Sequence, residues 1–238
     1  MNKLLSSLVL VGASTFVFGM EYYSKIEPVN VYNIKSAVSG NVVYINNAIE
    51  SKQINKTTIV KIDSKVNQID LSQSKIKLQS LEDVLSIENS TLESYKKISS
   101  KSKFDKDNQK VKILNIESTI SDLKTKIATL EDQINKKTLS EQNRYIYDIS
   151  VEIGDYVNPG TLLYTAMDLS KGKLEIFIPM DSAMDIKNKT IYLDGKKSDL
   201  KISKLYTVAD TKHISSYKCE IIIPAPKTFS KLTKIEFK

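Results

Sequence analysis

The sequence predicts an α+β fold in which a long antiparallel helical hairpin interrupts a β module and a small antiparallel β-barrel follows. Two short stretches, 54–61 and 157–164, resemble each other, and each follows an apolar-alternating run. Between them, the segment 64–137 has heptad periodicity and contains neither Gly nor Pro. Short alternating runs then continue to residue 237. Together these features indicate two halves of one β module, separated by a coiled coil and followed by further strands.

The second half of the segment 64–137 has the clearest helical pattern. Its apolar residues recur at steps of three and four: Ile113, Ile116, Ile120, Leu123, Ile127, Leu130 and Ile134. This spacing places them on one narrow seam, as in a coiled coil. The residues between them are mostly polar, so we expect this arm to contact only its partner arm rather than a broad core.

The first half of the segment has a looser pattern. Its apolar positions are Ile76, Leu78, Leu81, Leu85, Leu92, Tyr95 and Ile98, and Glu88 interrupts them. The periodicity fades over 99–108, where we place the reversal of the chain. Each arm of about 35 residues would be about 50 Å long. The alternative is an ordinary helical bundle, but the sequence offers no third amphipathic helix to complete one.

The N-terminus has the features of an export signal. Lys3 precedes an apolar run over 4–18, which is typical of a signal-peptide core and short for a membrane span. Val17 and Gly19 are small enough for the −3 and −1 positions of a cleavage site. We therefore predict a signal peptide over 1–19. The alternative, an uncleaved anchor, would need a longer apolar run.

Composition argues against several classes of function. The net charge is +7, but Arg144 is the only arginine, and readers of nucleic acid depend on arginine for bidentate contacts. Cys219 and His213 are the only residues of their types, which disfavours disulfides, zinc sites and histidine-based triads. No glycine-rich phosphate loop is present. We therefore predict no catalytic residues, no metal, no cofactor and no nucleic-acid partner.

The last part of the chain, 171–238, reads as a series of short strands. Alternating runs lie at 174–178, 190–193, 200–206, 217–223 and 234–237. Asp194-Gly195 directly follows the second run, and this dipeptide is a strong signal for a β-hairpin. Short strands at this density predict a small antiparallel barrel or sandwich.

These parts, in this order, resemble the membrane fusion proteins, also called periplasmic adaptors of the HlyD type. The stretch Ser36-Ala37-Val38-Ser39-Gly40-Asn41-Val42 resembles the first half-motif of that family. The stretch Gly154-Asp155-Tyr156-Val157-Asn158-Pro159-Gly160 contains the Gly-Asp-x-Val-x-x-Gly core of the second. The segment 208–212 also resembles part of the family's barrel. The resemblance covers essentially all of the chain after residue 19.

The resemblance implies a domain arrangement. The two half-motifs, 28–63 and 142–170, would form a split lipoyl-like module, also called a barrel-sandwich hybrid. Gly40, Gly154 and Gly160 would serve as its structural turn residues. The coiled-coil hairpin 64–137 is inserted between the halves, and the β-barrel takes up 171–238.

The resemblance also extends to the hairpin tip, at 100–105. It implies that Ser100, Lys101, Phe104 and Asp105 contact a partner protein. For Phe104 the alternative is simple capping of the hairpin end.

Three departures from the family pattern stand out. Ser51 and Thr57 occupy the places that Gly154 and Gly160 have in the second half-motif, so the first half must build its turns differently or avoid positive φ. Asn89 or a neighbour stands where family members place an arginine before the tip. The Asp-Lys-Ala/Val tripeptide that carries lipoate or biotin is absent, so we expect no covalent cofactor.

By this resemblance the chain is a periplasmic adaptor for efflux or secretion, and not an enzyme. It would link an inner-membrane transporter, of RND or ABC type, to an outer-membrane TolC-like channel. It would be exported with a cleaved signal peptide, stay at the inner membrane through the transporter, and assemble as a ring of three or six copies. The alternatives are an exported coiled-coil scaffold or binding module without a transport role, and an enzyme of the lipoyl or biotinyl carrier class.

Overall fold

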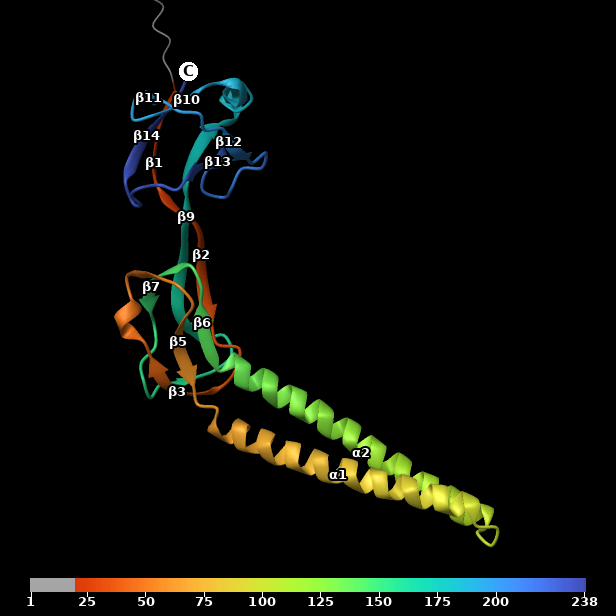
Figure 1. The fold of residues 1–238 in the computed structure, drawn as a ribbon. Coiled ribbons are helices and arrows are strands. Elements are labelled where there is room, and N and C mark those ends of the chain that lie inside the picture. The colour runs from red at the N-terminus through yellow and green to blue at the C-terminus, as the bar shows by residue number, and fades with distance from the viewer. Residues whose placement is uncertain (1–19) are drawn as a thin grey trace, which may run out of the picture. The chain divides into compact units, whose positions relative to one another are not determined.

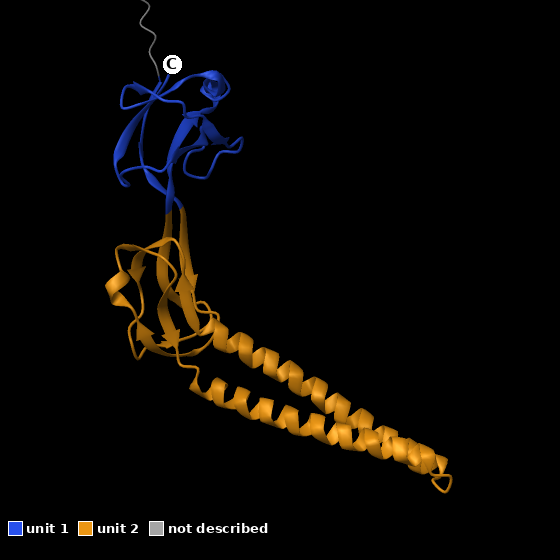
Figure 2. Cartoon of the chain, viewed as in Figure 1, with its two compact units in different colours: residues 1–29, 169–238 blue, residues 30–168 orange. Residues whose placement is uncertain are grey.

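The computed structural model describes residues 20–238, so the predicted signal peptide 1–19 lies outside the described residues. The chain divides into two compact units (Figure 2). The described part of unit 1 comprises residues 20–29 and 169–238, and unit 2 comprises residues 30–168. Helices and strands are both present: a pair of long helices lies in unit 2, and β-sheets lie in both units (Figure 1).

The β module of unit 2 is built from two half-motifs that pair with each other. Its strands are β2 (Glu27–Lys35), β3 (Gly40–Ile45), β4 (Lys52–Ile54), β5 (Thr57–Ile62), β6 (Thr138–Glu141), β7 (Arg144–Ile149), β8 (Tyr156–Val157) and the first part of β9 (Leu162–Pro179). β4, from the first half, pairs with β7, and β8, from the second half, pairs with β3. Each half therefore completes the sheet of the other.

The two half-motifs enter these pairings through equivalent hydrogen bonds. The N–H of Ser51 donates to the carbonyl of Ile146 at 2.8 Å, and the N–H of Gly154 donates to the carbonyl of Val42 at 2.9 Å. The interlocked strands enclose one apolar core. Its fully buried members include Ile59, Val60, Ile146, Leu163, Tyr164 and Ala166.

The structure settles how the first half-motif manages without glycine. Ser51 has φ 59°, so it adopts the left-handed conformation that Gly154 adopts at φ 101°. Thr57, in contrast, lies in strand β5, and its hydroxyl donates to the carbonyl of Asn55 at 2.5 Å. Gly160, at the corresponding place, has φ 95°. The first turn is thus preserved without glycine, and the second is built differently.

Gly40 is needed for a close approach. A Cβ at this position would lie 2.7 Å from Cγ2 of Ile62, which is closer than packed atoms tolerate. Ile62 is buried in the core of the module and directly precedes the chain segment that leads into the hairpin.

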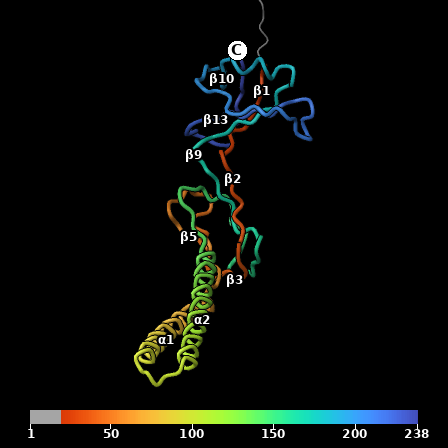
Figure 3. The backbone as a smooth tube through the Cα atoms, turned by 90° about the vertical axis from the view of Figure 1, so that its right-hand side faces the viewer, coloured from red at the N-terminus to blue at the C-terminus, as the bar shows by residue number. Residues whose placement is uncertain are grey.

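Two long helices form the hairpin, α1 (Lys65–Lys97) and α2 (Lys103–Lys136). Figures 1 and 3 show them side by side, and ion pairs join them across the seam. Lys75 pairs with Glu131 at 2.7 Å, and Lys124 pairs with Glu82 at 3.1 Å. Because the partner in α2 moves back from 131 to 124 as the position in α1 advances from 75 to 82, the arms run antiparallel.

The seam of α2 follows the predicted positions, whereas that of α1 differs in detail. In α2, Ile113, Ile120, Leu123 and Leu130 are buried, and Ile116, Ile127 and Ile134 are half-buried. The inward-facing residues of α1 also step by three and four: Leu71, Ser74, Leu78, Leu81, Leu85, Glu88, Leu92 and Tyr95. Ile76 and Ile98 were predicted among its apolar seam positions, but they are 61% and 44% exposed. Ile76 lies off the three-and-four spacing that the other members share, and Ile98 lies beyond the end of α1 at Lys97.

Polar contacts fix the base of the hairpin to the β module. The Lys137 ammonium donates to the carbonyl of Asp63 at 2.6 Å and to Oδ1 of Asn67 at 2.7 Å. The amide of Asn67 in turn donates to Oε1 of Gln133 at 2.9 Å. Residues from both ends of the hairpin therefore meet at one network where the helices leave the module.

Unit 1 is built from short strands around its own core. Its strands are β1 (Met20–Lys25), the second part of β9, β10 (Ile191–Leu193), β11 (Lys196–Lys197), β12 (Ile202–Leu205), β13 (Ser216–Pro224) and β14 (Leu232–Phe237). One sheet has the order β1-β14-β10-β11, and β12 and β13 pair next to β9. Asp194 and Gly195 both have positive φ, as expected for the turn between β10 and β11.

The core of unit 1 joins strands from the two ends of the described chain. Leu174, Ile178, Ile186, Cys219, Ile221 and Ile235 are fully buried in it. β1 pairs along its whole length with β14, from Met20 opposite Phe237 to Lys25 opposite Leu232. The N-terminal strand is therefore an integral part of this unit, although the predicted barrel domain began at residue 171.

Candidate partner-binding site at the hairpin tip

The turn between the helices is tighter than predicted. α1 ends at Lys97 and α2 begins at Lys103, so the reversal occupies 98–102 instead of 99–108. Of the predicted site residues, Ser100 and Lys101 lie in this turn, whereas Phe104 and Asp105 lie in the first turn of α2. All four are thus gathered at the end of the hairpin.

A capping box defines the start of α2. The N–H of Asp105 donates to Oγ of Ser102 at 3.1 Å, and the N–H of Ser102 donates to Oδ2 of Asp105 at 3.1 Å. This reciprocal pair satisfies backbone donors that a helix start leaves free. The hydrogen bonds from Ser102 lower the pKa of the Asp105 carboxyl below its usual value. Asp105 therefore has a structural function at the tip, and its contact with a partner remains a prediction.

Lys101 and Phe104 differ in how they are held. The Lys101 ammonium lies 4.4 Å from the centre of the Tyr95 ring, a cation–π contact that holds it against the end of α1. Phe104 is 73% exposed, so it does not cap the hairpin end by packing against it. Phe104 is therefore exposed at the start of α2, and its contact with a partner remains a prediction.

Sequence reasoning treated Glu88 as an interruption, but the structure shows a polar layer inside the seam. The Gln109 amide donates to Oε2 of Glu88 at 2.7 Å and to the carbonyl of Glu88 at 2.9 Å. The Lys112 ammonium pairs with Oε1 of Glu88. The hydrogen bonds from Gln109 and then from Lys112 lower the pKa of Glu88. The three-and-four spacing of Leu81, Leu85, Glu88 and Leu92 was the signal that could have placed this residue in the seam.

A polar layer of this kind can specify the alignment of two helices. A buried polar residue at a seam position favours the register in which it finds its partner. Glu88 and Gln109 are paired in the observed alignment of α1 and α2. The layer therefore favours this register of the two helices.

Arg144 and His213, each the only residue of its type, both make contacts with neighbouring side chains. Among residues 20–238 there is no group of three His, Cys, Asp or Glu side chains that could hold a metal. The Arg144 guanidinium pairs with Asp168 at 3.0 Å and lies over the ring of Tyr32. His213 is stacked on Phe177. No helix within the described range is both long and apolar enough to cross a membrane.

Comparisons with known proteins agree on the fold. No protein-family model matches the chain, and no curated protein matches it either. Solved structures do match. MacA from Actinobacillus actinomycetemcomitans is 18% identical with a TM-score of 0.73, over 92% of this chain and 78% of that one. The membrane fusion protein Spr0693 from Streptococcus pneumoniae R6 is 10% identical with a TM-score of 0.73, over 92% and 98%.

A third match bears on the hairpin itself. It is a MacA–MexA chimeric protein that contains the α-hairpin domain of Pseudomonas aeruginosa MexA. It is 16% identical to this chain with a TM-score of 0.66, over 92% of this chain and 81% of the chimera. Because these structures match nearly the whole described chain, hairpin and β units together, the chain has the fold of the membrane fusion proteins.

Proposed function

We propose that this chain is a periplasmic adaptor that links an inner-membrane transporter to an outer-membrane TolC-like channel for efflux or secretion. The observation that carries the proposal is the exposed tip of a long hairpin that is fixed at its base. α1 and α2 have 33 and 34 residues, which makes the hairpin about 50 Å long. A hairpin of this length, with one apolar residue displayed at its end, is suited to reach and bind a distant partner.

The finer domain assignment is part of the proposal. The split β module, 28–63 plus 142–170, is lipoyl-like, and unit 1 closes into a small β-barrel. The interlocked half-motifs support the first assignment, and the pairing of β1 with β14 around one core supports the second. Residues 1–19 are removed as a signal peptide, so that the mature chain begins near Met20.

The partners follow from the architecture. The transporter is of RND or ABC type, and several copies of the chain form a ring of three or six. Each tip offers only a small apolar contact, so the affinity for a channel comes from the simultaneous binding of several tips in one ring. The function is assembly and sealing, without catalysis and without a cofactor.

Site-specific photo-crosslinking tests the proposal. The native thiol of Cys219 is fully buried, and burial raises its pKa to about 12. It should therefore not react with maleimides in the folded chain. A Phe104→Cys chain can therefore be labelled with benzophenone maleimide at the tip alone. On irradiation of cell envelopes we expect an adduct with an outer-membrane channel, identified by mass spectrometry.

A matched control carries the label away from the tip. Ser86 is exposed in the middle of α1, so Ser86→Cys presents the same probe on the same hairpin. It should give no channel adduct. A channel adduct from Ser86→Cys, or none from Phe104→Cys in cells that still export, would contradict the tip contact. The second outcome would favour an exported scaffold.

A further inference from the structure

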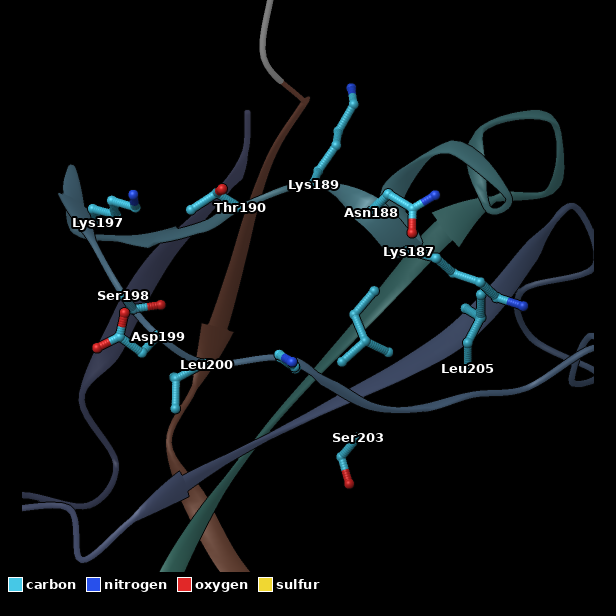
Figure 4. A pocket seen from close by; sticks show the side chains of 12 residues that line it. Lys187, Asn188, Lys189, Thr190, Lys197, Ser198, Asp199, Leu200, Ser203 and Leu205 are labelled. Carbon is cyan, nitrogen blue, oxygen red and sulfur yellow. The ribbon is translucent and has the colours of Figure 1, made fainter.

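An open groove lies on unit 1 (Figure 4). It has a volume of about 700 Å³ and is bordered by the segment 187–190 on one side and by residues between Lys197 and Leu205 on the other. Four lysines line it: Lys187, Lys189, Lys197 and Lys201. Asp199 is its only acidic lining residue. The lining therefore carries an excess of positive charge.

None of these four lysines forms an ion pair within residues 20–238, whereas other lysines of the same unit are paired. Lys218, for example, lies 3.0 Å from Glu175, and Lys231 lies 2.7 Å from Asp194. Four positive charges gathered beside a single negative one create a positive potential that attracts anions.

The groove is located where the described chain begins. Thr190, on its rim, exchanges two backbone hydrogen bonds with Lys238, at 2.8 and 3.0 Å. The next residue, Ile191, is opposite Phe237, which is itself opposite Met20. Figure 4 shows the side chain of Lys189 directed toward the same end of the sheet, where β1 starts.

The sequence next to this end of the unit carries the predicted export signal. The apolar run 4–18 joins the chain just before Met20. As a signal segment, this run would direct the chain to the membrane for export, with Met20 just after it. An anionic bilayer surface is therefore the partner that we consider for the unpaired lysines.

We propose that Lys187, Lys189, Lys197 and Lys201 form a binding surface for the phosphate headgroups of anionic phospholipids. The hydroxyl groups of Thr190 and Ser198 also line the groove and can donate to phosphate oxygens. Each lysine near an anionic bilayer strengthens binding about fivefold, so the four act together even though each is weak. The surface would hold unit 1 against the membrane independently of any transporter or channel.

Vesicle flotation with the mature chain, purified from the cell envelope, tests this surface. Vesicles of phosphatidylcholine alone are compared with vesicles that also contain phosphatidylglycerol, at low and high salt. We expect binding to the anionic vesicles only, weakened by salt. Replacing the four groove lysines with Gln should weaken binding about 25-fold even if only two of them touch lipid.

The control variant removes the same charge elsewhere. Lys65, Lys77, Lys97 and Lys126 are exposed on the hairpin and form no ion pair within the described chain, so their replacement with Gln matches the change in net charge. This variant should bind like the wild type. Should the fourfold groove variant misfold by circular dichroism, single Lys187→Gln and Lys201→Gln chains should each lose about fivefold.

Three outcomes would overturn the assignment. Equal losses in the groove and hairpin variants would mean that only net charge matters. Equal binding to both kinds of vesicle would point to apolar contact instead. Competition by inorganic phosphate beyond that of chloride at equal ionic strength would mean that the groove takes free phosphate rather than a headgroup. None of these results depends on the tip crosslinking, so the two proposals fail separately.

Discussion

Single residues decide how the β module closes, and Ser51 is the clearest case. It holds φ 59° in the turn where the second half-motif has Gly154. A left-handed conformation costs a residue with a Cβ about 1–2 kcal/mol, whereas glycine adopts it freely. We therefore expect Ser51→Gly to raise the free energy of unfolding by about 0.5–1 kcal/mol, measured by urea denaturation.

The same substitution in a helix provides the control. Ser94 is exposed on α1, and glycine there should lower the free energy of unfolding of the hairpin by about 0.5 kcal/mol. Opposite signs at the two serines would establish that the backbone at Ser51 is strained. If both changes destabilise equally, the turn is not strained.

Glu88 confers a pH dependence on the hairpin. Hydrogen bonds from Gln109 and Lys112 hold its pKa in the folded chain below the ordinary value of 4.5. A carboxyl whose pKa is depressed by folding stabilises the fold above its unfolded pKa, and this contribution is lost as the pH falls through the folded pKa. Acidification below 4.5 should therefore reduce the wild-type melting temperature more than that of Glu88→Gln.

The comparison needs a control because every carboxylate contributes to acid sensitivity. Glu117 is exposed on α2 and belongs to no ion pair in the described chain. Glu117→Gln should follow the wild-type acid profile in far-UV circular dichroism melts. An acid profile for Glu88→Gln that coincides with that of Glu117→Gln would show that the polar layer contributes no pH dependence.

At the scale of elements, the hairpin depends on its narrow seam. Leu123 is 8% exposed within the seam of α2, and burying a carboxylate there costs several kcal/mol unless it is neutralised. Leu123→Asp should therefore unfold the hairpin and reduce the helical signal in circular dichroism while the β signal remains. Leu114 lies on the same helix but is 61% exposed. Leu114→Asp should leave the helical signal unchanged, and a loss of helix in both variants would mean that burial in the seam is not the cause.

The same element shows how far the sequence can predict. The hairpin could be predicted because its apolar residues repeat in every turn of each helix. Each helix could therefore be identified from its own sequence alone. The errors at Ile76 and Glu88 have one cause, namely that apolar character was taken as the sign of burial, whereas Ile98 is exposed because α1 ends before it. On a helix whose only partner is one other helix, position relative to the seam decides burial, and a glutamate can lie inside while an isoleucine lies outside.

The position of the hairpin tip could be predicted from the sequence, but the contacts of its individual residues could not. The gap in the heptads located it, and the pattern Ser-x-x-Asp at 102–105 was a legible capping signal that explains Asp105. The contact of Lys101 with Tyr95 depends on the particular path of a five-residue turn, which no periodicity specifies. The exposure of Phe104 likewise follows from where α2 begins, and helix boundaries are the least predictable part of an element.

At the scale of the whole molecule, the two units join segments that are remote in sequence. β1 meets β14 across more than two hundred residues, and the chain has no local signal for such a pairing. Which strands pair depends on which apolar sheet faces are buried against each other. In unit 1 these faces form the core that contains Leu174, Ile221 and Ile235. The interlocking of β4 with β7 and of β3 with β8 is of the same kind, although there the repeated motif hinted at it.

Because each unit has its own core, damage to one should spare the other. Cys219 reports on unit 1, since it is fully buried there and its thiol has a pKa raised to about 12 by burial. Leu123 belongs to unit 2. In the Leu123→Asp chain the hairpin is lost, but the thiol should stay as unreactive toward a chromogenic disulfide as in the wild type.

In urea both chains should react at once, because unfolding exposes the thiol and returns its pKa toward the ordinary value of 9.0. Rapid labelling of Cys219 in the Leu123→Asp chain without denaturant would mean that the two units unfold together, and that the hairpin stabilises the whole molecule.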